Sequence, residues 1–590
     1  MHPWLRAHLK KHVVAYCLAV SMTLVVSAIN LVNPLLAGVL VDRVIIAGEL
    51  SLLWKILGIM VLAVVVKSTI RYSYQMICER VSQDVLRSCR QELFVKLQRM
   101  DFGYFDRTKT GDIMAHMTGD LDAVRHFIAW VVYQIAENLI MFVAAIAALF
   151  FVDWRLTLAM LAVAPFIGAL TFALARKVKP TFAAVRAQFS RLNSTVQENI
   201  AGNRVVRALT REDYETDKFQ AENGAYRDRN VESAAVWARY IPPIEFFSGV
   251  LPVILILVGG AMIIRGEMTL GGLVTFNGLV WAINQPMRMA GWLVNDVQRY
   301  AAAADRLDKL FALQSALPGG RKGLRPASIE GRVEFRNVSF SYGDENVLEG
   351  VDFVAEPGQT IGILGPTGSG KSSIGRLMCR YYDATSGEIL LDGVDVRDYD
   401  LDFLRSKVGV AMQDVFLFSD TIEGNIAFGC PDAPMREIVR AAELANAHEF
   451  VGELDQGYDT IIGERGVGLS GGQRQRVALA RLLLASPPVM ILDDTTSSVD
   501  IETEERIQES LKSLRGTRTM FIIAHRVSSL MHADRILVIK DGRVAERGTH
   551  EELRALGGYY EEVYRHQTGS GARAAARPEG TTSSRPGCEE

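Results

Sequence analysis

The stretch Gly365-Pro-Thr-Gly-Ser-Gly-Lys-Ser372 decides the fold of the C-terminal part of this 590-residue chain. It follows Gln359-Thr-Ile-Gly-Ile-Leu364, a short run typical of a buried strand, and a helical pattern comes after it. Glycines in such a loop let backbone N–H groups turn toward a phosphate at a helix N-terminus. Strand, glycine-rich loop and helix in this order predict a phosphate-binding loop in an α/β nucleotide-binding domain.

Backbone and side chains of this loop have separate expected tasks. Lys371 is expected to reach the β- and γ-phosphates of a nucleotide, and the Ser372 hydroxyl is expected to bind Mg²⁺. The predicted nucleotide-contacting residues of the loop are Gly365, Thr367, Gly368, Ser369, Gly370, Lys371, Ser372 and Ser373.

A second motif, Leu469-Ser-Gly-Gly-Gln473, lies further along the chain. Ser470, Gly471 and Gly472 open a helical pattern that starts near Gln473, and a helix N-terminus with flanking glycines suits a phosphate. The two motifs together resemble the ATP-binding-cassette (ABC) superfamily, in which the second is the signature. The resemblance implies that one ATP lies between the phosphate loop of one cassette and the signature of another. Because this chain has one copy of each motif, the resemblance implies a dimer.

Five further positions match motifs of the same superfamily. Val489-Met-Ile-Leu-Asp493 resembles the Walker B strand, whose aspartate supports Mg²⁺. Gln413 matches the Q-loop glutamine, which contacts Mg²⁺ and the attacking water, and His525 matches the switch histidine at the γ-phosphate. Asp500 matches the D-loop, which crosses the dimer interface, and Tyr342 matches the aromatic residue that stacks on adenine.

The position after Asp493 departs from the family pattern. The family has a glutamate there as general base, whereas this chain has Asp494. Aspartate is one methylene shorter, which moves the carboxylate back by on the order of 1 Å and can cost about 10²-fold in rate. We expect a heterodimer in which this chain carries a degenerate site and a different chain brings the glutamate. The alternative is an active homodimer in which Asp494 still works. The predicted catalytic residues are Asp494, His525 and Gln413.

The N-terminal half is apolar in long stretches. Six of them are long enough to cross a bilayer of about 30 Å, which takes about 20 residues. They lie near 13–41, 52–77, 128–152, 155–175, 244–264 and 269–295. Residues 1–12 are predicted to form an amphipathic elbow on the membrane surface. The net charge of −3 gives no case for nucleic-acid binding.

Two long polar connections, 78–127 and 176–243, are rich in arginine and lysine. The positive-inside rule places these two connections in the cytoplasm, together with both termini and the cassette. The chain is therefore expected to span the cytoplasmic (inner) membrane. They keep helical periodicity, so the membrane helices are expected to continue into them. Their tips, near 105–112 and 208–219, resemble the coupling helices with which exporters of the ABC superfamily dock on the cassettes.

Composition defines the remaining boundaries. Residues 315–330 contain proline and glycine and predict a linker between a transmembrane domain at 13–314 and a cassette at 331–567. Residues 568–590 have the composition of a disordered tail. Residues 463–466 resemble the exporter loop that touches the coupling helices. The six cysteines are scattered and predict neither a zinc site nor a disulfide framework.

Three charged residues, Lys67, Glu137 and Glu245, lie in or at the edge of apolar stretches. Intramembrane charges are costly and tend to face a cavity or each other. We expect at least one of the two acids to line a substrate pathway. Pairing among the charges, or extension of Lys67 toward the interface, is the alternative.

The predicted molecule is a six-helix polytopic membrane domain fused to an α/β P-loop cassette. It is expected to bind ATP and Mg²⁺ and to export amphipathic or hydrophobic substrates, drugs or lipids, by alternating access as one half of a dimer. The motifs leave open an active homodimer, an importer on the exporter fold, and a protein in which ATP mainly gates. A soluble cassette ATPase is disfavoured by the apolar stretches.

Overall fold

The computed structural model describes residues 2–317, 319–463 and 466–568, with the side chains of Met287 and Arg288 left out. The chain forms two compact units. The first consists of Met1–Arg99 and Thr108–Gln314, and the second consists of Met100–Arg107 and the chain from Ser315 onward.

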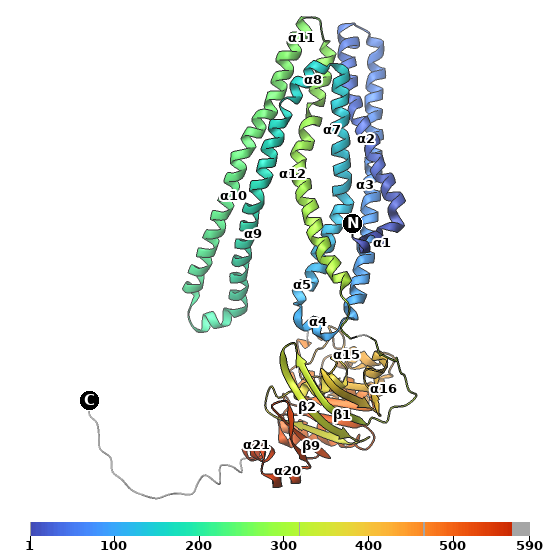
Figure 1. The fold of residues 1–590 in the computed structure, drawn as a ribbon, viewed down its shortest axis with the longest axis vertical. Helices are drawn as coiled ribbons and strands as arrows, with labels where there is room; N and C mark the ends of the chain where they lie inside the picture. Colours follow the sequence, from blue (N-terminus) through green and yellow to red (C-terminus); the bar gives the residue numbers. More distant parts are fainter. Residues whose placement is uncertain (1, 318, 464–465, 569–590) are drawn as a thin grey trace, which may run out of the picture. The chain divides into compact units, whose positions relative to one another are not determined.

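The first unit is built from long helices joined to short ones (Figure 1). They are α1 Pro3–Leu9, α2 Val13–Val39, α3 Leu53–Gln98, α5 Thr110–Ala115, α6 Leu121–His126, α7 Val132–Val152, α8 Trp154–Leu161, α9 Ala164–Ala208, α10 Glu212–Ile254, α11 Gly260–Ile264 and α12 Leu270–Ala312. Short π-helical stretches continue α2 to Ile46 and join α5 to α7 and α10 to α11. Several of the long helices are therefore continuous over more than forty residues.

Five helical segments in the described chain are long and apolar enough to cross a membrane. They are Pro3–Ile46, Leu50–Gln98, Thr110–Val152, Trp154–Ala208 and Glu212–Ile264. The sixth predicted span, 269–295, is helical within α12 but less apolar. The predicted spans therefore lie in helical segments, and five of the six coincide with described segments that are long and apolar enough to cross a membrane.

Helices α9 and α10 form an antiparallel hairpin. Gln188 Nε2 donates to Glu222 Oε2 across the pair at 2.5 Å, and Asn199 Nδ2 donates to Glu215 Oε2 at 2.7 Å. The turn covers residues 209–211, with Thr210 at φ +51°, so most of the predicted tip at 208–219 belongs to α10. Figure 1 shows the lower end of this hairpin lying apart from the lower parts of α3 and α12.

Helix α2 packs against α3, α7 and α12, and its closest approach to α12 depends on glycine. A Cβ atom on Gly271 would lie 2.1 Å from the carbonyl oxygen of Gly38. At the same point Asp42 Oδ1 accepts a hydrogen bond of 2.7 Å from Gly271 N–H, which is one of the free donors at the start of α12. The backbones therefore meet closely and one buried donor is satisfied.

The second unit contains two sheets. The larger one has the order β10-β9-β3-β8-β7-β6, parallel except for the β10–β9 pair, and the smaller antiparallel one has the order β2-β1-β4-β5. Their bounds are β1 Val333–Tyr342, β2 Glu345–Ala355, β3 Thr360–Leu364, β4 Ser386–Leu391, β5 Val394–Asp395, β6 Val408–Ala411, β7 Val489–Asp493, β8 Thr519–Ile523, β9 Arg535–Lys540 and β10 Arg543–Gly548.

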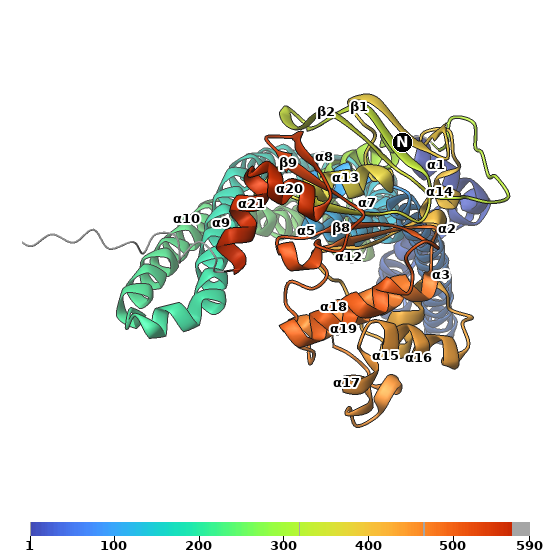
Figure 2. The same ribbon diagram turned by 90° about the horizontal axis from the view of Figure 1, so that it is seen from below.

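The helices of this unit are α4 Phe102–Arg107, α13 Lys371–Met378, α14 Leu401–Lys407, α15 Ile422–Ile426, α16 Met435–Leu444, α17 His448–Gly452, α18 Gly471–Ala485, α19 Ile501–Lys512, α20 His550–Leu556 and α21 Tyr559–Thr568. One hydrophobic core combines both sheets with the inward face of α13, including Phe335, Phe521 and Leu377. Figure 2 shows α15, α16 and α17 on the side of this unit opposite to β1 and β2.

The predicted linker lies along the second unit. Arg321 N–H donates to the carbonyl of Arg397 at 2.8 Å, and Leu324 N–H donates to that of Asp398 at 3.1 Å. At the other end, α21 runs through Thr568, one residue into the predicted tail at 568–590. The rest of that tail lies outside the described residues, as do Glu464 and Arg465 of the loop 463–466.

Candidate nucleotide-binding site

The predicted site residues follow the carboxyl ends of four neighbouring parallel strands. The phosphate loop follows β3, His525 follows β8, Asp493 ends β7 and Gln413 follows β6. The register pairs Ile523 of β8 with Asp493 of β7, so these strands end at the same level. This edge is where parallel α/β sheets bind ligands.

The phosphate loop has the backbone geometry of an anion cradle. Gly368 and Gly370 have φ values of +82° and +93°, a region that favours glycine. A Cβ atom on Gly370 would also lie 2.6 Å from Leu348 Cδ2. Ser369 is buried, and its Oγ has no hydrogen-bond partner among the described residues. Turned backbone and an orphaned hydroxyl fit a phosphate group. Thr367 is exposed at the tip of the loop.

Lys371 lies folded over this loop. Its Nζ donates to the carbonyl oxygens of Gly365 at 2.9 Å and Pro366 at 2.8 Å. Burial lowers the pKa of Lys371, and the charges of Asp493 and Asp494 oppose that shift. A cation held at the loop by two carbonyls is placed to meet phosphate charge.

Ser372 and Asp493 meet beneath the loop. Ser372 Oγ donates a hydrogen bond of 3.0 Å to Asp493 Oδ1. Burial raises the pKa of Asp493, and the hydrogen bond from Ser372 and the charge of Arg376 work against that rise. A hydroxyl and a carboxylate side by side are oxygen ligands of the kind that Mg²⁺ takes together with nucleotide phosphates.

Asp494 has a constrained backbone and an unengaged side chain. Its φ is +51°, which aspartate tolerates better than most residues. Its N–H donates to Ile523 O at 2.8 Å, and its carbonyl accepts from Ser497 Oγ at 3.0 Å. Its half-buried carboxylate makes no hydrogen bond in the described part of the chain.

Tyr342, at the end of β1, lies over the start of α13. Arg376 Nη1 donates to its hydroxyl oxygen at 3.0 Å, and Ser373 Oγ is 3.5 Å from the same oxygen. Its ring meets the ring of Tyr382 edge to face, with centroids 5.1 Å apart. The aromatic side chain therefore borders the phosphate loop, as adenine stacking requires.

Gln413 and His525 reach the same sheet edge without touching the residues above. Both are exposed, and within the described residues neither side chain makes a hydrogen bond. The loop that carries His525 is nevertheless held in place. Gln567 Nε2 donates to the His525 carbonyl at 2.8 Å, and Val527 N–H donates to Gln567 Oε1 at 2.8 Å. Sequence reasoning missed Gln567, because it lies at the edge of the predicted tail and carries no motif.

Glu504 is a second residue that sequence reasoning missed. It is buried in α19, and its carboxylate accepts hydrogen bonds from Thr496, Ser529 and Arg526, the last at 2.9 Å. Thr496 belongs to the loop after β7, and Arg526 and Ser529 follow His525. Glu504 therefore ties together two loops of the site. The sequence signal that could have identified Glu504 is an acidic residue on the apolar face of an amphipathic helix.

The signature residues form the start of α18. Ser470 Oγ accepts from Gln473 N–H at 3.2 Å, and Gln473 Oε1 accepts from Ser470 N–H at 2.8 Å, which is a capping box. A Cβ atom on Gly472 would lie 2.8 Å from the carbonyl oxygen of Ser498. Gly471 also faces Ser498, so the helix start packs closely on the loop after β7.

Gln475 strengthens this contact within the same chain. Its Nε2 donates to Ser497 Oγ at 3.0 Å, and its Oε1 accepts from Ser498 N–H at 3.1 Å. Asp500 then caps α19 by accepting from Thr503 N–H at 2.9 Å, and this backbone hydrogen bond lowers the pKa of Asp500. In the described chain no hydrogen bond or ion pair joins residues 470–473 to residues 365–373. The structure therefore does not bring the signature and the phosphate loop of one chain together.

Helix α4 belongs to the second unit and contains residues 105–107 of the first predicted coupling tip, whose remaining residues, 108–112, belong to the first unit. The ring of Phe102 stacks on that of Tyr381 with centroids 4.1 Å apart, and the Tyr382 hydroxyl donates to Asp106. Because Tyr382 also meets Tyr342, a chain of contacts runs from α4 to the candidate adenine-stacking residue.

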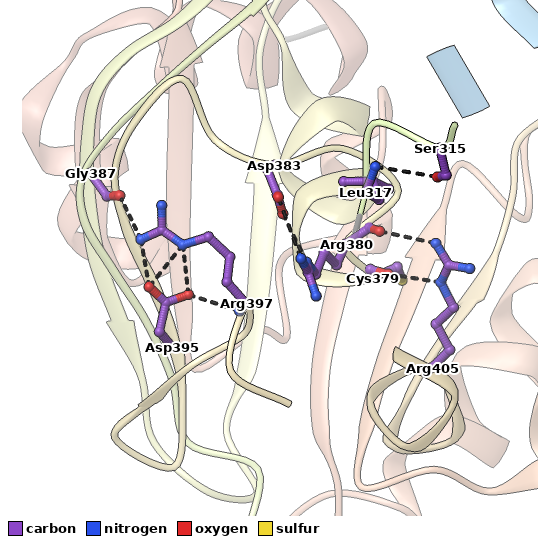
Figure 3. A network of polar contacts seen from close by, with 9 residues as sticks. All are labelled: Ser315, Leu317, Cys379, Arg380, Asp383, Gly387, Asp395, Arg397 and Arg405. Carbon is purple, nitrogen blue, oxygen red and sulfur yellow. Dashed lines mark hydrogen bonds and ion pairs between the residues drawn. The ribbon is translucent and has the colours of Figure 1, made fainter. Parts of the chain in front are cut away.

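The backbone before these tyrosines is fixed by arginines (Figure 3). Arg380 has φ +49°, and its Nε donates to Asp383 Oδ1 at 2.8 Å. Arg405 Nη2 donates to the carbonyl of Arg380 at 3.0 Å. This buried network orients Tyr381 and Tyr382 toward α4.

Comparison with known proteins gives consistent matches along the chain. The ABC transporter transmembrane region matches residues 16–287, and the ABC transporter family matches residues 348–497. The ABC transporter ATP-binding protein YknU of Bacillus subtilis is 39% identical over 544 residues, covering 92% of this chain and 93% of the relative. The ATP-dependent lipid A-core flippase of Syntrophus aciditrophicus is 32% identical over 563 residues, covering 95% of this chain and 93% of the relative.

A solved structure gives the same result at the level of the fold. The structure of a bacterial Atm1-family ABC exporter with ATP bound matches this chain with a TM-score of 0.78 and 27% sequence identity. The match covers 96% of this chain and 99% of the exporter chain. The chain combines apolar helices and a nucleotide-binding fold in one polypeptide, and these relatives match nearly its whole length. It therefore belongs to the ABC transporter family, as an exporter-type protein that hydrolyses ATP to drive transport across a membrane.

Proposed function

We propose that the protein exports amphipathic or hydrophobic substrates, drugs or lipids, as one half of a dimer that carries two ATP sites. The Ser372–Asp493 hydrogen bond beneath the phosphate loop carries the ATPase part of this proposal. The apolar helices support the substrate class, as do two relatives, a lipid A-core flippase and the multidrug resistance-like protein MdlA of Escherichia coli.

The roles of the residues follow from their positions. Backbone N–H groups of residues 365–373 and Lys371 would bind the phosphates, and the Tyr342 ring would stack on adenine. Ser372, Asp493 and Gln413 would hold Mg²⁺, which neutralises phosphate charge when bound. His525 would contact the γ-phosphate from the end of β8.

The remaining contacts to this nucleotide would come from the second chain. Ser470, Gly471, Gly472 and Gln473 would meet the γ-phosphate of the partner's ATP, since an exposed helix start offers free N–H groups. Asp500 and its loop would cross the interface. The separation of signature and phosphate loop within one chain supports this arrangement.

We infer further that the partner is a different chain and that this chain carries the degenerate site. The Asp494 backbone is held on both sides, by Ile523 and by Ser497, so the main chain cannot move forward to compensate for the missing methylene. A shortfall on the order of 1 Å at a general base lowers the rate at this site. The intact signature would complete the partner's better site.

Coupling would run through α4 and the turn at residues 209–211. ATP-driven closure of the cassettes would move Tyr382 and Asp106 together, and the long helices would carry that motion into the membrane domain. The arginine and lysine in the long connections support a cytoplasmic position for these tips, the cassette and both termini.

Two measurements test this function. Inside-out vesicles containing the protein and a partner half-transporter with the Walker B glutamate should accumulate a fluorescent amphiphile when ATP and Mg²⁺ are added. Efflux in the opposite direction would favour the importer, and an ATP-dependent conductance without accumulation would favour a gate. The chain purified alone should hydrolyse ATP slowly, and an ordinary transporter rate from it would reject the heterodimer in favour of a homodimer.

A further inference from the structure

Asp101 is a buried carboxylate at the point where the chain passes from α3 to α4. It is 8% exposed, and it accepts hydrogen bonds from two separate parts of the chain. Its Oδ1 accepts from Tyr104 N–H at 3.0 Å, which caps the start of α4. Its Oδ2 accepts from Ala316 N–H at 2.7 Å and from Ser315 Oγ at 3.3 Å. Asp101 therefore binds the chain that leaves α12 to the start of α4.

These hydrogen bonds keep Asp101 ionised. Burial raises its pKa, but the N–H groups of Ala316 and Tyr104 outweigh burial and hold the pKa below its ordinary value. A carboxylate that accepts backbone N–H groups in a buried place forms charge-assisted hydrogen bonds, which are stronger than those between neutral groups. The contact between Asp101 and Ala316 is therefore a firm one at neutral pH.

A second contact joins the same two parts of the chain within the first unit. Lys96, in the last turn of α3, donates from Nζ to the carbonyl oxygen of Phe311, near the end of α12. That carbonyl is one of the free acceptors that a helix C-terminus leaves. The chain passes between the two units after Arg99 and again after Gln314. The chain that leaves α3 and the chain that leaves α12 are therefore joined just before these crossings and just after them.

The chain that follows α12 has no regular structure of its own. Residues 313–317 are neither helix nor strand. Such a segment can absorb a displacement by rotating about its φ and ψ angles instead of passing the displacement on. Figure 3 shows Ser315 beside Leu317, whose N–H donates to Ser315 Oγ at 3.3 Å. By fixing Ser315 and Ala316, Asp101 removes much of this freedom.

Helix α4 is itself held by the cassette. Phe102 stacks on Tyr381, and Asp106 accepts a hydrogen bond from Tyr382. A displacement of α4 reaches α3 through the continuous chain between them. The chain that leaves α12 is not continuous with α4, and the hydrogen bonds from Ser315 and Ala316 both end on the Asp101 carboxylate. That carboxylate is therefore placed to transmit the displacement to α12.

We propose that Asp101 is a positioning residue for the coupling of ATP hydrolysis to transport. By holding Ser315 and Ala316 against α4, it makes the chain that leaves α12 follow α4 when the cassette moves. Without this contact α3 still receives the displacement, but residues 313–317 absorb the part that would reach α12. The inference rests on the proposed function, in which α4 transmits cassette motion, and it adds a residue outside the nucleotide site on which transport per ATP depends.

The test uses the full-length protein with its partner half-transporter in phosphatidylcholine vesicles that have the cassettes outside. Uptake of rhodamine 6G is divided by the ATP hydrolysed in the same vesicles. Asp101→Asn still caps α4, because asparagine is as good an N-cap residue as aspartate, but it turns an amide N–H toward the N–H of Ala316. It should lower the transport per ATP by about fivefold or more and leave basal ATPase activity within about twofold, since no nucleotide contact changes. Glu330→Gln, which removes an exposed acid of the linker, should change neither quantity.

A pair of cysteines separates transmission from folding. In Asp101→Cys/Ala316→Cys the carboxylate contact is absent under reducing conditions, and transport per ATP should be as low as in Asp101→Asn. Oxidation should form a disulfide between the two positions, identified by mass spectrometry, and restore transport per ATP to within about twofold of the wild type. Neither single variant should respond to oxidation.

Three results would overturn the inference. They are wild-type transport per ATP in Asp101→Asn, no disulfide between positions 101 and 316 after oxidation, and a disulfide that restores nothing. Failure of the proposed function looks different, because the wild type itself would then neither transport rhodamine 6G nor be stimulated by it.

Discussion

Ser372 Oγ lies 3.0 Å from Asp493 Oδ1, so the first turn of α13 is hydrogen-bonded to the end of β7. Both groups are placed to share one Mg²⁺. In this chain purified alone, where every site contains Asp494, we expect Ser372→Ala and Asp493→Asn each to lower the slow ATPase activity by about 10²-fold, and the double variant to cost little more, because the two residues act as a unit. Titration of activity with Mg²⁺ should show a weaker half-saturation for Ser372→Ala and a normal one for Ser372→Thr. Equal Mg²⁺ dependence in all variants would contradict the assignment.

Substitutions of Asp494 distinguish a heterodimer from a homodimer. In the assembled heterodimer, Asp494→Asn should leave ATPase activity within about threefold, since the partner's site does most of the hydrolysis. Replacing the partner chain's acid at the corresponding position should abolish it. In a homodimer Asp494→Asn would itself abolish activity, and Asp494→Glu would raise it. Steady-state ATPase assays on both variants distinguish the two outcomes.

Gln567 positions the loop of His525 through two hydrogen bonds of 2.8 Å. In this chain purified alone, Gln567→Ala should lower kcat by about tenfold with little change in KM for ATP, because loss of both bonds frees the loop rather than the nucleotide. In a His525→Ala background the same substitution should have no further effect. Glu562→Gln, on the exposed face of the same helix, is the matched control. Additive effects of the two substitutions in the double variant would show that Gln567 does not act through His525.

Tyr382 links α4 to the nucleotide site. Tyr382→Phe removes the hydrogen bond to Asp106 and keeps the ring that meets Tyr342. We expect basal ATPase activity to change by less than about twofold, while stimulation by a transported amphiphile falls, because only the link to α4 is weakened. Asp106→Asn should behave in the same way. Comparison of basal with stimulated activity measures the effect, and equal losses of both would rule out a role in coupling.

Cys379 is expected to be chemically silent in the folded protein. Burial raises the pKa of its thiol to about 12, against a small lowering by Arg405. At pH 8 only about one thiol in 10⁴ is then ionised, and the reactive thiolate increases as pH rises toward that value. Maleimide should label the half-buried Cys430 and spare Cys379 until the cassette is unfolded. Cys379→Ser should leave native labelling unchanged, and rapid labelling of Cys379 would contradict its burial.

Local patterns were sufficient for much of the molecule. The strand, loop and helix around residues 360–378 follow from short-range sequence, because glycine φ values and apolar runs act within a few residues. The apolar stretches likewise located the long helices. Boundaries at the hairpin of α9 and α10 were less accurate, since charged residues after 212 are compatible with either a turn or a helix start.

By itself the sequence predicted the chemistry of the site from four features: the phosphate loop, the aspartate at Asp493, the signature-like motif at 469–473 and the shorter acid Asp494. Only the tertiary structure decided which groups meet. The Ser372–Asp493 contact, the hold of Gln567 on His525 and the pairing of Glu137 with Arg71 all join residues distant in sequence. Such contacts depend on strand order and helix packing, which a motif does not encode.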